Sequence, residues 1–194
     1  SKTGVYVAPR DLNHSYQWDR MPLEITQETS SEQFHEIAML MADIGAAIQA
    51  DYGTDETSAS YDKQAIFAHF GYNNGLYRQQ SDYSAQEWYS MIKSQLDNNR
   101  PVLYNAKTSD NNGAHSFIID GYAQDDYFCI NWGWEGQYNG VFALNAMDLD
   151  FTDYNGLQSA YFDFQPAAGM PTVAVVNDSI NCPSVEAAMG VVPF

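Results

Sequence analysis

Three side chains that together suit an acid–base site lie at the ends of two neighbouring apolar runs. His115 begins the first run, and Asn131 and Trp132 end the second. Because polar, turn-forming residues separate the runs, we predict that they pair as a β-hairpin and bring Asn131 back to His115. An imidazole that is oriented by a neutral amide and shielded by an indole is suited to activate a cysteine nucleophile. The pattern therefore predicts His115 as the base, Asn131 as the residue that orients it and Trp132 as its cover.

The cysteine that such a base would activate is missing upstream of it. The sequence holds two cysteines, Cys129 and Cys182, and both follow His115. We interpret Cys129 as an ordinary strand residue on the face that it shares with Asn131, and a single bridge between the two cysteines is left open. Cys182 begins a short helical candidate, where the helix dipole would lower the pKa of a thiol, so it is the alternative nucleophile. A companion chain or propeptide segment that carries the cysteine is favoured over it.

Helical patterns fill the region before the hairpin. Ser30 and Gln33 form a capping box, and apolar residues at spacings of three and four follow it. A shorter helix is predicted over residues 60–70, and a third helix follows the capping box of Ser84 and Glu87. The apolar face predicted for the first helix comprises Phe34, Ile37, Ala38, Met41, Ile44, Gly45 and Ile48. The buried stripe predicted for the third comprises Trp88, Met91, Ile92 and Leu96.

Strand patterns follow residue 100. Runs of β-branched and aromatic residues predict strands over residues 102–104, 115–123, 127–132, 140–144 and 160–164. Three helices followed by an antiparallel sheet make an α+β fold. We expect residues 1–166 to form the major part of one domain, and residues 167–194 to be a C-terminal extension or the start of a following segment.

The composition excludes several classes of function. The 194 residues include 25 acidic and 8 basic side chains, and the formal net charge of -17 would repel nucleic acid and anionic membranes. No apolar run approaches the roughly 20 residues needed to span a bilayer. We therefore expect a protein that is secreted or on the cell surface and binds neither nucleic acid nor membrane. The first residues lack an initiator Met and an apolar leader, which indicates a processed or excised piece. Since His14, His35 and His69 lie at no metal-ligand spacing, no metal and no cofactor are expected.

Two stretches of this sequence, GAHSFIIDGY and YFCINWGWEG, resemble the motif of the streptopain (C10-type) family of papain-like cysteine proteases. The resemblance extends over about residues 16–166 through shorter matches at residues 40–45, 51–53 and 100–104. It implies a papain-like catalytic domain and cysteine-type endopeptidase activity on peptide or protein substrates. Carried over residue by residue, it makes His115 the catalytic histidine, Asn131 the residue that orients it and Trp132 the covering indole.

This chain departs from the family pattern in two ways. Asn105 stands near the place of a family glutamine that helps to stabilise the oxyanion, and Gly113, Gly133 and Trp134 are the other candidate cleft residues. The family's nucleophilic cysteine begins a helix that comes before the region of Tyr16, where this chain has no cysteine. The resemblance therefore implies a chain that contributes the His/Asn/Trp half of an active site, with the cysteine on a preceding or companion segment. The alternative is a non-catalytic, protease-like binding or inhibitory module.

Two geometric expectations follow for the hairpin. The ring of His115 should form a hydrogen bond with the side chain of Asn131, because paired arms bring them together. Trp132 should pack over that pair while Trp134 faces the opposite side, since Gly133 should break the alternation of strand side chains.

Overall fold

The structure, a computed structural model, describes residues 10–22, 24–53, 57–59, 69–73, 75–123 and 126–167. These residues divide into two compact units, which are described separately. Residues 10–73, with their gaps, and 166–167 belong to the first unit, and residues 75–165 belong to the second. The sequence did not indicate this division. His115, Asn131 and Trp132 all lie in the second unit.

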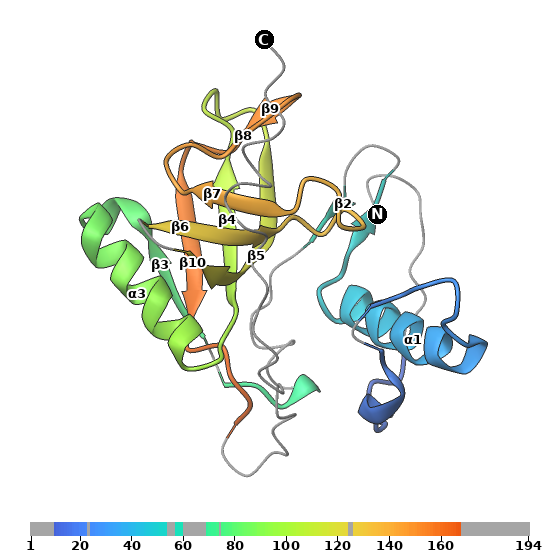
Figure 1. Cartoon of the computed structure of the whole chain (residues 1–194). Helices are drawn as coiled ribbons and strands as arrows, with labels where there is room; N and C mark the ends of the chain where they lie inside the picture. Colours follow the sequence, from blue (N-terminus) through green and yellow to red (C-terminus); the bar gives the residue numbers. More distant parts are fainter. Residues whose placement is uncertain are drawn as a thin grey trace. The chain divides into compact units, whose positions relative to one another are not determined.

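The first unit is built around helix α1, Ser31–Ala47 (Figure 1). The predicted capping box is confirmed, because the side chains of Ser30 and Gln33 each bond the other's backbone N–H. The predicted apolar face is only partly buried: Phe34 is 52% exposed and Met41 is 65% exposed. The other elements of this unit are the 3-10 turn η1, Trp18–Arg20, and the short antiparallel strands β1, Asp51–Tyr52, and β2, Thr57–Ser58.

A buried carboxylate fixes the N-terminal residues of this unit to α1. Asp43 is fully buried on the helix, and its Oδ2 accepts a hydrogen bond from the hydroxyl of Tyr16 at 3.0 Å. The same carboxylate pairs with Arg10 and with Nε2 of His14. His14, to which the sequence assigned no metal role, thus has a structural partner here.

The number of helices differs from the prediction in the part of the chain that the structure describes. Two α-helices are present there, α1 and α3, where three were predicted. Most of the remaining prediction, residues 60–68, lies outside the described residues, and only His69 and Phe70 of that segment are described, both in helical conformation. The C-terminal extension predicted from residue 167 onward also lies outside them, apart from Ala167. None of the described helices is both long and apolar enough to cross a membrane.

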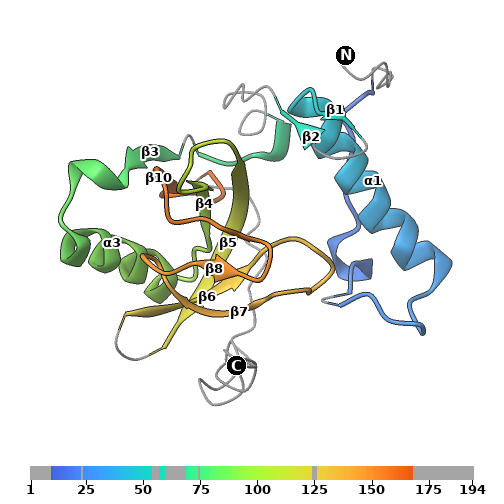
Figure 2. The ribbon, with the colours of Figure 1, turned by 90° about the horizontal axis from the view of Figure 1, so that it is seen from above.

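The second unit is a six-stranded antiparallel sheet in the order β3-β10-β4-β5-β6-β7, with α3 packed on one face (Figures 1 and 2). The α+β class with an antiparallel sheet is thereby confirmed. One strand of this sheet was missed: β3 precedes α3, and its largely exposed residues show no apolar alternation. The short strands β8 and β9, which pair outside this sheet, were not predicted either. The elements are β3, Leu76–Gln79; η2, Gln80–Asp82; α3, Ala85–Asp97; β4, Val102–Lys107; β5, Ala114–Tyr122; β6, Tyr127–Asn131; β7, Gly140–Ala143; β8, Asp148–Leu149; β9, Thr152–Asp153; and β10, Gln158–Phe162.

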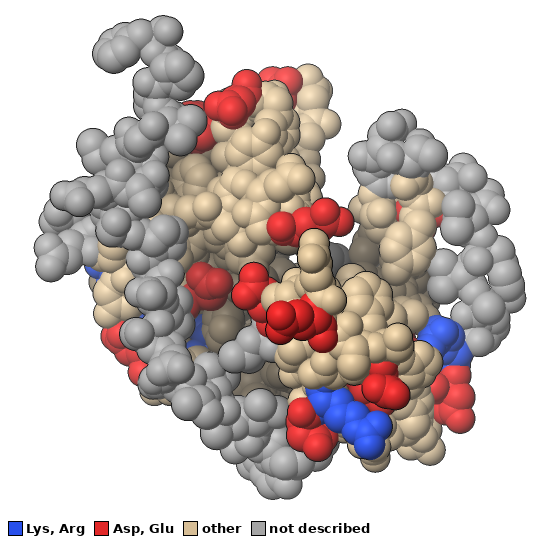
Figure 3. Space-filling model, turned by 45° about the vertical axis from the view of Figure 1, so that its right-hand side comes forward, with Lys and Arg blue, Asp and Glu red and all other residues tan. Residues whose placement is uncertain are grey.

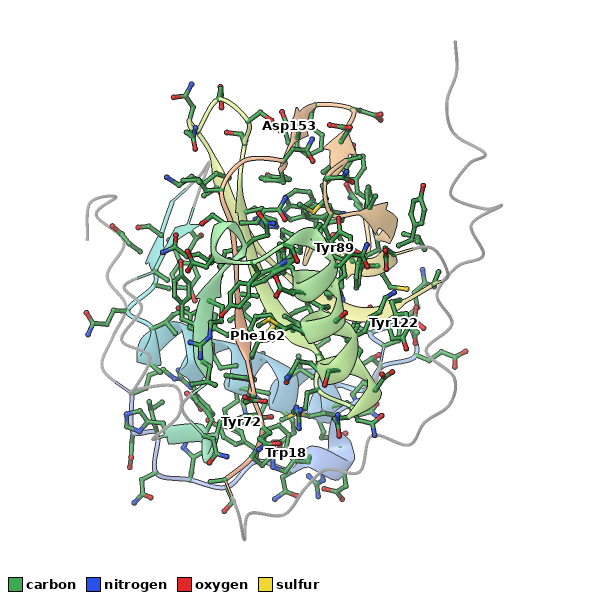
Figure 4. The ribbon with its side chains drawn as sticks, turned by 90° about the vertical axis from the view of Figure 1, so that its left-hand side faces the viewer. Trp18, Tyr72, Tyr89, Tyr122, Asp153 and Phe162 are labelled. Carbon is green, nitrogen blue, oxygen red and sulfur yellow. The ribbon has the colours of Figure 1, made fainter. Side chains whose placement is uncertain are left out.

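Helix α3, which lies in front of the sheet in Figure 4, contributes residues of its predicted stripe to the core. Trp88 and Ile92 are fully buried, and the indole of Trp88 meets the ring of Phe162 edge-on at 5.2 Å. The indole N–H of Trp88 donates to the hydroxyl of Tyr104 at 2.8 Å, and that hydroxyl donates to Gln158 at 2.6 Å. The buried polar groups of the two aromatic rings are therefore paired, which removes the cost of burying them.

Two loops at one end of the sheet are bonded to each other. The N–H of Gly156 donates to the carbonyl of Lys107 at 2.9 Å, and the hydroxyl of Ser109 donates to Asp153 at 2.6 Å. Asp153 appears at the top of Figure 4. These bonds join the β4–β5 turn to the segment from Asp153 of β9 to Gly156, and they hold Tyr154, which lies between these two residues.

The close approach at Gly156 yields a stability prediction. A Cβ at this position would lie 2.4 Å from the carbonyl oxygen of Thr108 and 2.9 Å from that of Lys107. We expect Gly156→Ala to lower the free energy of unfolding by about 1–3 kcal/mol, because backbone atoms must shift to make room. Urea denaturation measures the difference. Gly140→Ala is the matched control, since its Cβ would meet its nearest neighbour at 3.5 Å; equal losses in the two variants would contradict the prediction.

Candidate active site

The position of His115 follows from the pairing of β5 with its neighbours. Ala106 of β4 lies opposite His115, and Phe117, two residues further along β5, is buried in the core. Alternate strand residues share a face, so His115 lies on the core face at the end of the sheet. On the other side, Ile118 pairs with Asn131. The residues that follow Asn131 therefore run toward the end of β5 that carries His115.

The hydrogen bond that orients the imidazole comes from the backbone. Nε2 of His115 lies 2.8 Å from the carbonyl oxygen of Trp132. A carbonyl only accepts, so Nε2 carries the proton and Nδ1 is the basic nitrogen. Among the described residues, Nδ1 has no hydrogen-bond partner. The ring is thus held in one tautomer with its basic nitrogen open.

The predicted hydrogen bond between His115 and Asn131 is therefore not the one that forms. The side chain of Asn131 is exposed, and its Oδ1 accepts a hydrogen bond from the N–H of Gly133 at 3.0 Å. The physical reason is a register shift in the β5–β6 pairing between Ile119 and Gly121. One extra residue on β5 turns Asn131 to the face opposite His115, because side-chain direction has a period of two.

Aromatic rings enclose the imidazole. The indole of Trp134 stacks on it at 4.5 Å with an interplanar angle of 24°, Tyr154 lies at 5.6 Å and Trp132 at 6.1 Å. The prediction that Trp134 faces away from the pair is wrong, and it is the nearest of these three rings. Strand β6 ends at Asn131, and Gly133 has a φ of 78°, so the chain bends there and both indoles stack on the same side at 5.7 Å.

Trp132 belongs both to the surroundings of His115 and to the hydrophobic core. Its indole is fully buried and lies 4.5 Å from the ring of Phe117 and 5.5 Å from that of Phe142. Its backbone N–H donates to Oδ1 of Asn139 at 2.9 Å, so that side chain helps to fix the carbonyl that holds His115. The indole N–H is buried without a hydrogen-bond partner in the part of the chain that the structure describes.

The other predicted site residues have separate surroundings. Asn105 pairs with Ser116 across β4 and β5, and its Oδ1 accepts from that hydroxyl at 2.6 Å. Since Ala106 is the residue opposite His115, the side chain of Asn105 lies on the other face of the sheet. The N–H of Gly113 donates to the hydroxyl of Thr108 at 2.9 Å in the loop before β5.

The two cysteines do not supply a thiol beside His115 in the described part of the chain. Cys129 is disulfide-bonded, so it is not a free nucleophile. Cys182, the alternative nucleophile, lies outside the described residues. Sequence reasoning also missed two contributors, Tyr154 and Asn139. Neither has a distinctive spacing from His115, because loops bring them to it.

Burial lowers the pKa of His115 below its ordinary value, and the hydrogen bond to the carbonyl of Trp132 offsets this only in part. The imidazole is therefore neutral at pH 7 and able to accept a proton. Folding favours the neutral imidazole, so His115 contributes to the free energy of unfolding. This contribution is fully present at pH values above the unfolded-state pKa of the histidine. That stability is lost as the pH falls through the folded-state pKa.

A proton NMR titration of the imidazole tests this environment. We expect a midpoint for His115 below the ordinary value of about 6.5. Trp134→Ala should raise the midpoint toward that value, because it removes the stacked ring that desolvates the imidazole. Tyr127→Ser, at the far end of β6, should leave it unchanged. A midpoint at or above the ordinary value in the unaltered chain would refute the burial argument.

Comparisons with known proteins place the chain in a family of peptidases. The sequence profile described as the Peptidase C10 family matches residues 5–142. Streptopain from Streptococcus pyogenes is 33% identical over 161 residues, which are 78% of this chain and 40% of streptopain. The thiol protease/hemagglutinin PrtT from Porphyromonas gingivalis is 34% identical over 141 residues, which are 71% of this chain and 16% of that protein. This chain thus spans less than half the length of either relative.

Solved structures support the fold. Active wild-type interpain A cysteine protease from Prevotella intermedia superimposes with a TM-score of 0.66 at 22% identity, over 77% of this chain and 64% of that one. A prointerpain A fragment from the same organism superimposes with a TM-score of 0.60 at 24% identity, over 82% of this chain and 50% of the fragment.

Proposed function

The chain belongs to the peptidase C10 family, and from that premise we propose that it supplies the histidine half of a cysteine endopeptidase active site. The observation that carries the proposal is the hydrogen bonding of the two ring nitrogens of His115. Its Nε2 is held by the carbonyl of Trp132, and its Nδ1 has no partner among the described residues. A ring that is oriented on one nitrogen and open on the other is prepared to exchange a proton with a nucleophile.

The proposed reaction is peptide-bond hydrolysis through an acyl-enzyme. Nδ1 of His115 takes the proton of a cysteine thiol, and the thiolate attacks the carbonyl carbon of the substrate. The imidazolium then protonates the leaving amine as the C–N bond breaks. In the second half, His115 takes a proton from water, the hydroxide displaces the thiolate, and the acid product leaves. Trp132 and Trp134 keep the ring in place and limit its contact with water.

We propose that the cysteine lies on a preceding or companion segment. The disulfide of Cys129 and the absence of any cysteine before it in the sequence support this. The rival assignment, a binding or inhibitory module without catalysis, does not require an open imidazole nitrogen.

An extracellular location is part of the proposal. A disulfide at Cys129 is typical of oxidising compartments, and the excess of acidic residues favours solubility. Acidic side chains outnumber basic ones on the face shown in Figure 3.

A mass measurement combined with thiol labelling tests the proposal. The native material that contains this chain is purified, its mass is measured, and it is treated with an epoxysuccinyl inhibitor that alkylates cysteine thiolates. We expect casein hydrolysis, and labelling of a cysteine other than Cys129 and Cys182, only when the additional segment is present. Hydrolysis by the 194-residue chain alone with label on Cys182 would overturn the companion-segment account. Native material that neither hydrolyses nor labels would favour the binding module.

A further inference from the structure

An exposed aromatic cluster continues outward from the imidazole. Trp134 lies 5.8 Å from Phe151 and 6.3 Å from Tyr138, and the rings of Tyr138 and Phe151 meet edge-on at 5.3 Å. Tyr138 is 43% exposed and Phe151 is 59% exposed. We call these three residues the aromatic shelf. A contiguous apolar patch on a surface is a candidate binding site.

The two turns that carry the shelf are held by other bonds. In the turn after β6, the N–H of Gln137 donates to the carbonyl of Trp134 at 2.8 Å. In the β8–β9 segment, Asn155 accepts from the N–H of Met147 at 2.6 Å and donates to Asp148 at 2.7 Å. These hydrogen bonds hold the two turns without the side chains of Tyr138 and Phe151, whose exposed rings are therefore available to a ligand.

The chemistry of peptide hydrolysis indicates which part of a substrate would meet the shelf. The imidazolium must lie within hydrogen-bond reach of the leaving amine to protonate it. The residue that follows the cleaved bond therefore lies beside His115. Trp134 stacks on that ring at 4.5 Å and contacts the rest of the shelf, so the side chain of this residue has the shelf as its neighbour.

We propose that the aromatic shelf binds the side chain of the residue just after the cleaved bond and selects an aromatic one. This inference rests on the proposed peptidase function. Phe151 and Tyr138 determine the selectivity, and Trp134 links them to the base. Aromatic pairs contribute beyond their buried area, which corresponds to about a two- to tenfold gain in affinity for each good pair.

Binding of a product-like dipeptide to the 194-residue chain tests the shelf without any turnover. Phenylalanyl-glycinamide and glycyl-glycinamide, which mimic the leaving fragment, are titrated while the indole N–H resonances are followed by ¹⁵N–¹H NMR. We expect the resonance of Trp134 to shift and the phenylalanyl compound to bind at least about threefold more tightly. Phe151→Ser and Tyr138→Ser should each remove most of that preference. Tyr127→Ser, an exposed aromatic residue outside the shelf, should retain it.

Two outcomes overturn the proposal. One is equal affinity for both dipeptides in the unaltered chain. The other is an undiminished preference in both Phe151→Ser and Tyr138→Ser, with thermal denaturation and the remaining resonances showing that the variants are folded. Cleavage of peptides by the complete enzyme, compared for Phe and Gly after the cleaved bond, separates the two hypotheses. Hydrolysis without this preference would refute the shelf alone, whereas shelf binding without hydrolysis would refute the peptidase function alone.

Discussion

Under the proposed function, His115→Ala is expected to lower kcat/KM of the complete protein by about 10³- to 10⁶-fold. Proton transfer by a positioned base contributes about 10²–10⁴-fold, and loss of a base that also activates the nucleophile costs more. Hydrolysis of a fluorogenic peptide by the native enzyme and its variant gives the ratio. Thermal denaturation of both checks that the variant is folded.

Asn131→Ala separates the two accounts of how His115 is oriented. Its side chain is exposed and bonds the N–H of Gly133, so we expect a loss of at most about tenfold, the effect of one hydrogen bond within the turn. If the amide were the orienting group, its removal would cost about 10²- to 10⁴-fold, as expected for a residue that holds a catalytic base in place. An effect of that size would refute the assignment to the carbonyl of Trp132.

Trp132→Ala is expected to lower the free energy of unfolding by about 3–5 kcal/mol, because it removes a fully buried indole from the core and leaves a cavity. Denaturation with urea gives the difference. The change should also raise the NMR-measured pKa of His115, since water gains access to the ring.

Trp132→Phe is the matched control. It keeps a ring beside Phe117 and Phe142, and it deletes an indole N–H that is buried without a partner among the described residues. Part of the cavity cost is therefore offset, because an unpaired buried donor is itself unfavourable. We expect a loss at least about 1 kcal/mol smaller than that of Trp132→Ala. Equal losses would contradict this expectation, because they would mean that the indole N–H is hydrogen-bonded and that its removal is itself destabilising.

Local patterns predicted much of the fold. Both capping boxes form, and Trp88 and Ile92 are buried as their spacing indicated. These features depend on residues a few positions apart, so the sequence contains their cause. The apolar face of α1 shows the limit of such reasoning: the spacing predicted burial, but Phe34 and Met41 are exposed because burial depends on what packs against a helix.

The sequence by itself determined the residue types at the site: one imidazole on a strand, an Asn-Trp pair ending the next strand, and a second indole after a glycine. The tertiary structure alone decided which groups contact the imidazole. The register shift between Ile119 and Gly121 turned Asn131 outward, and it placed the carbonyl of Trp132 on His115 and Trp134 over its ring. A shift of one residue reverses every side chain of a strand, while the chemistry of a backbone carbonyl is the same at every position. For that reason no pattern of side chains could identify the group that orients the imidazole of His115.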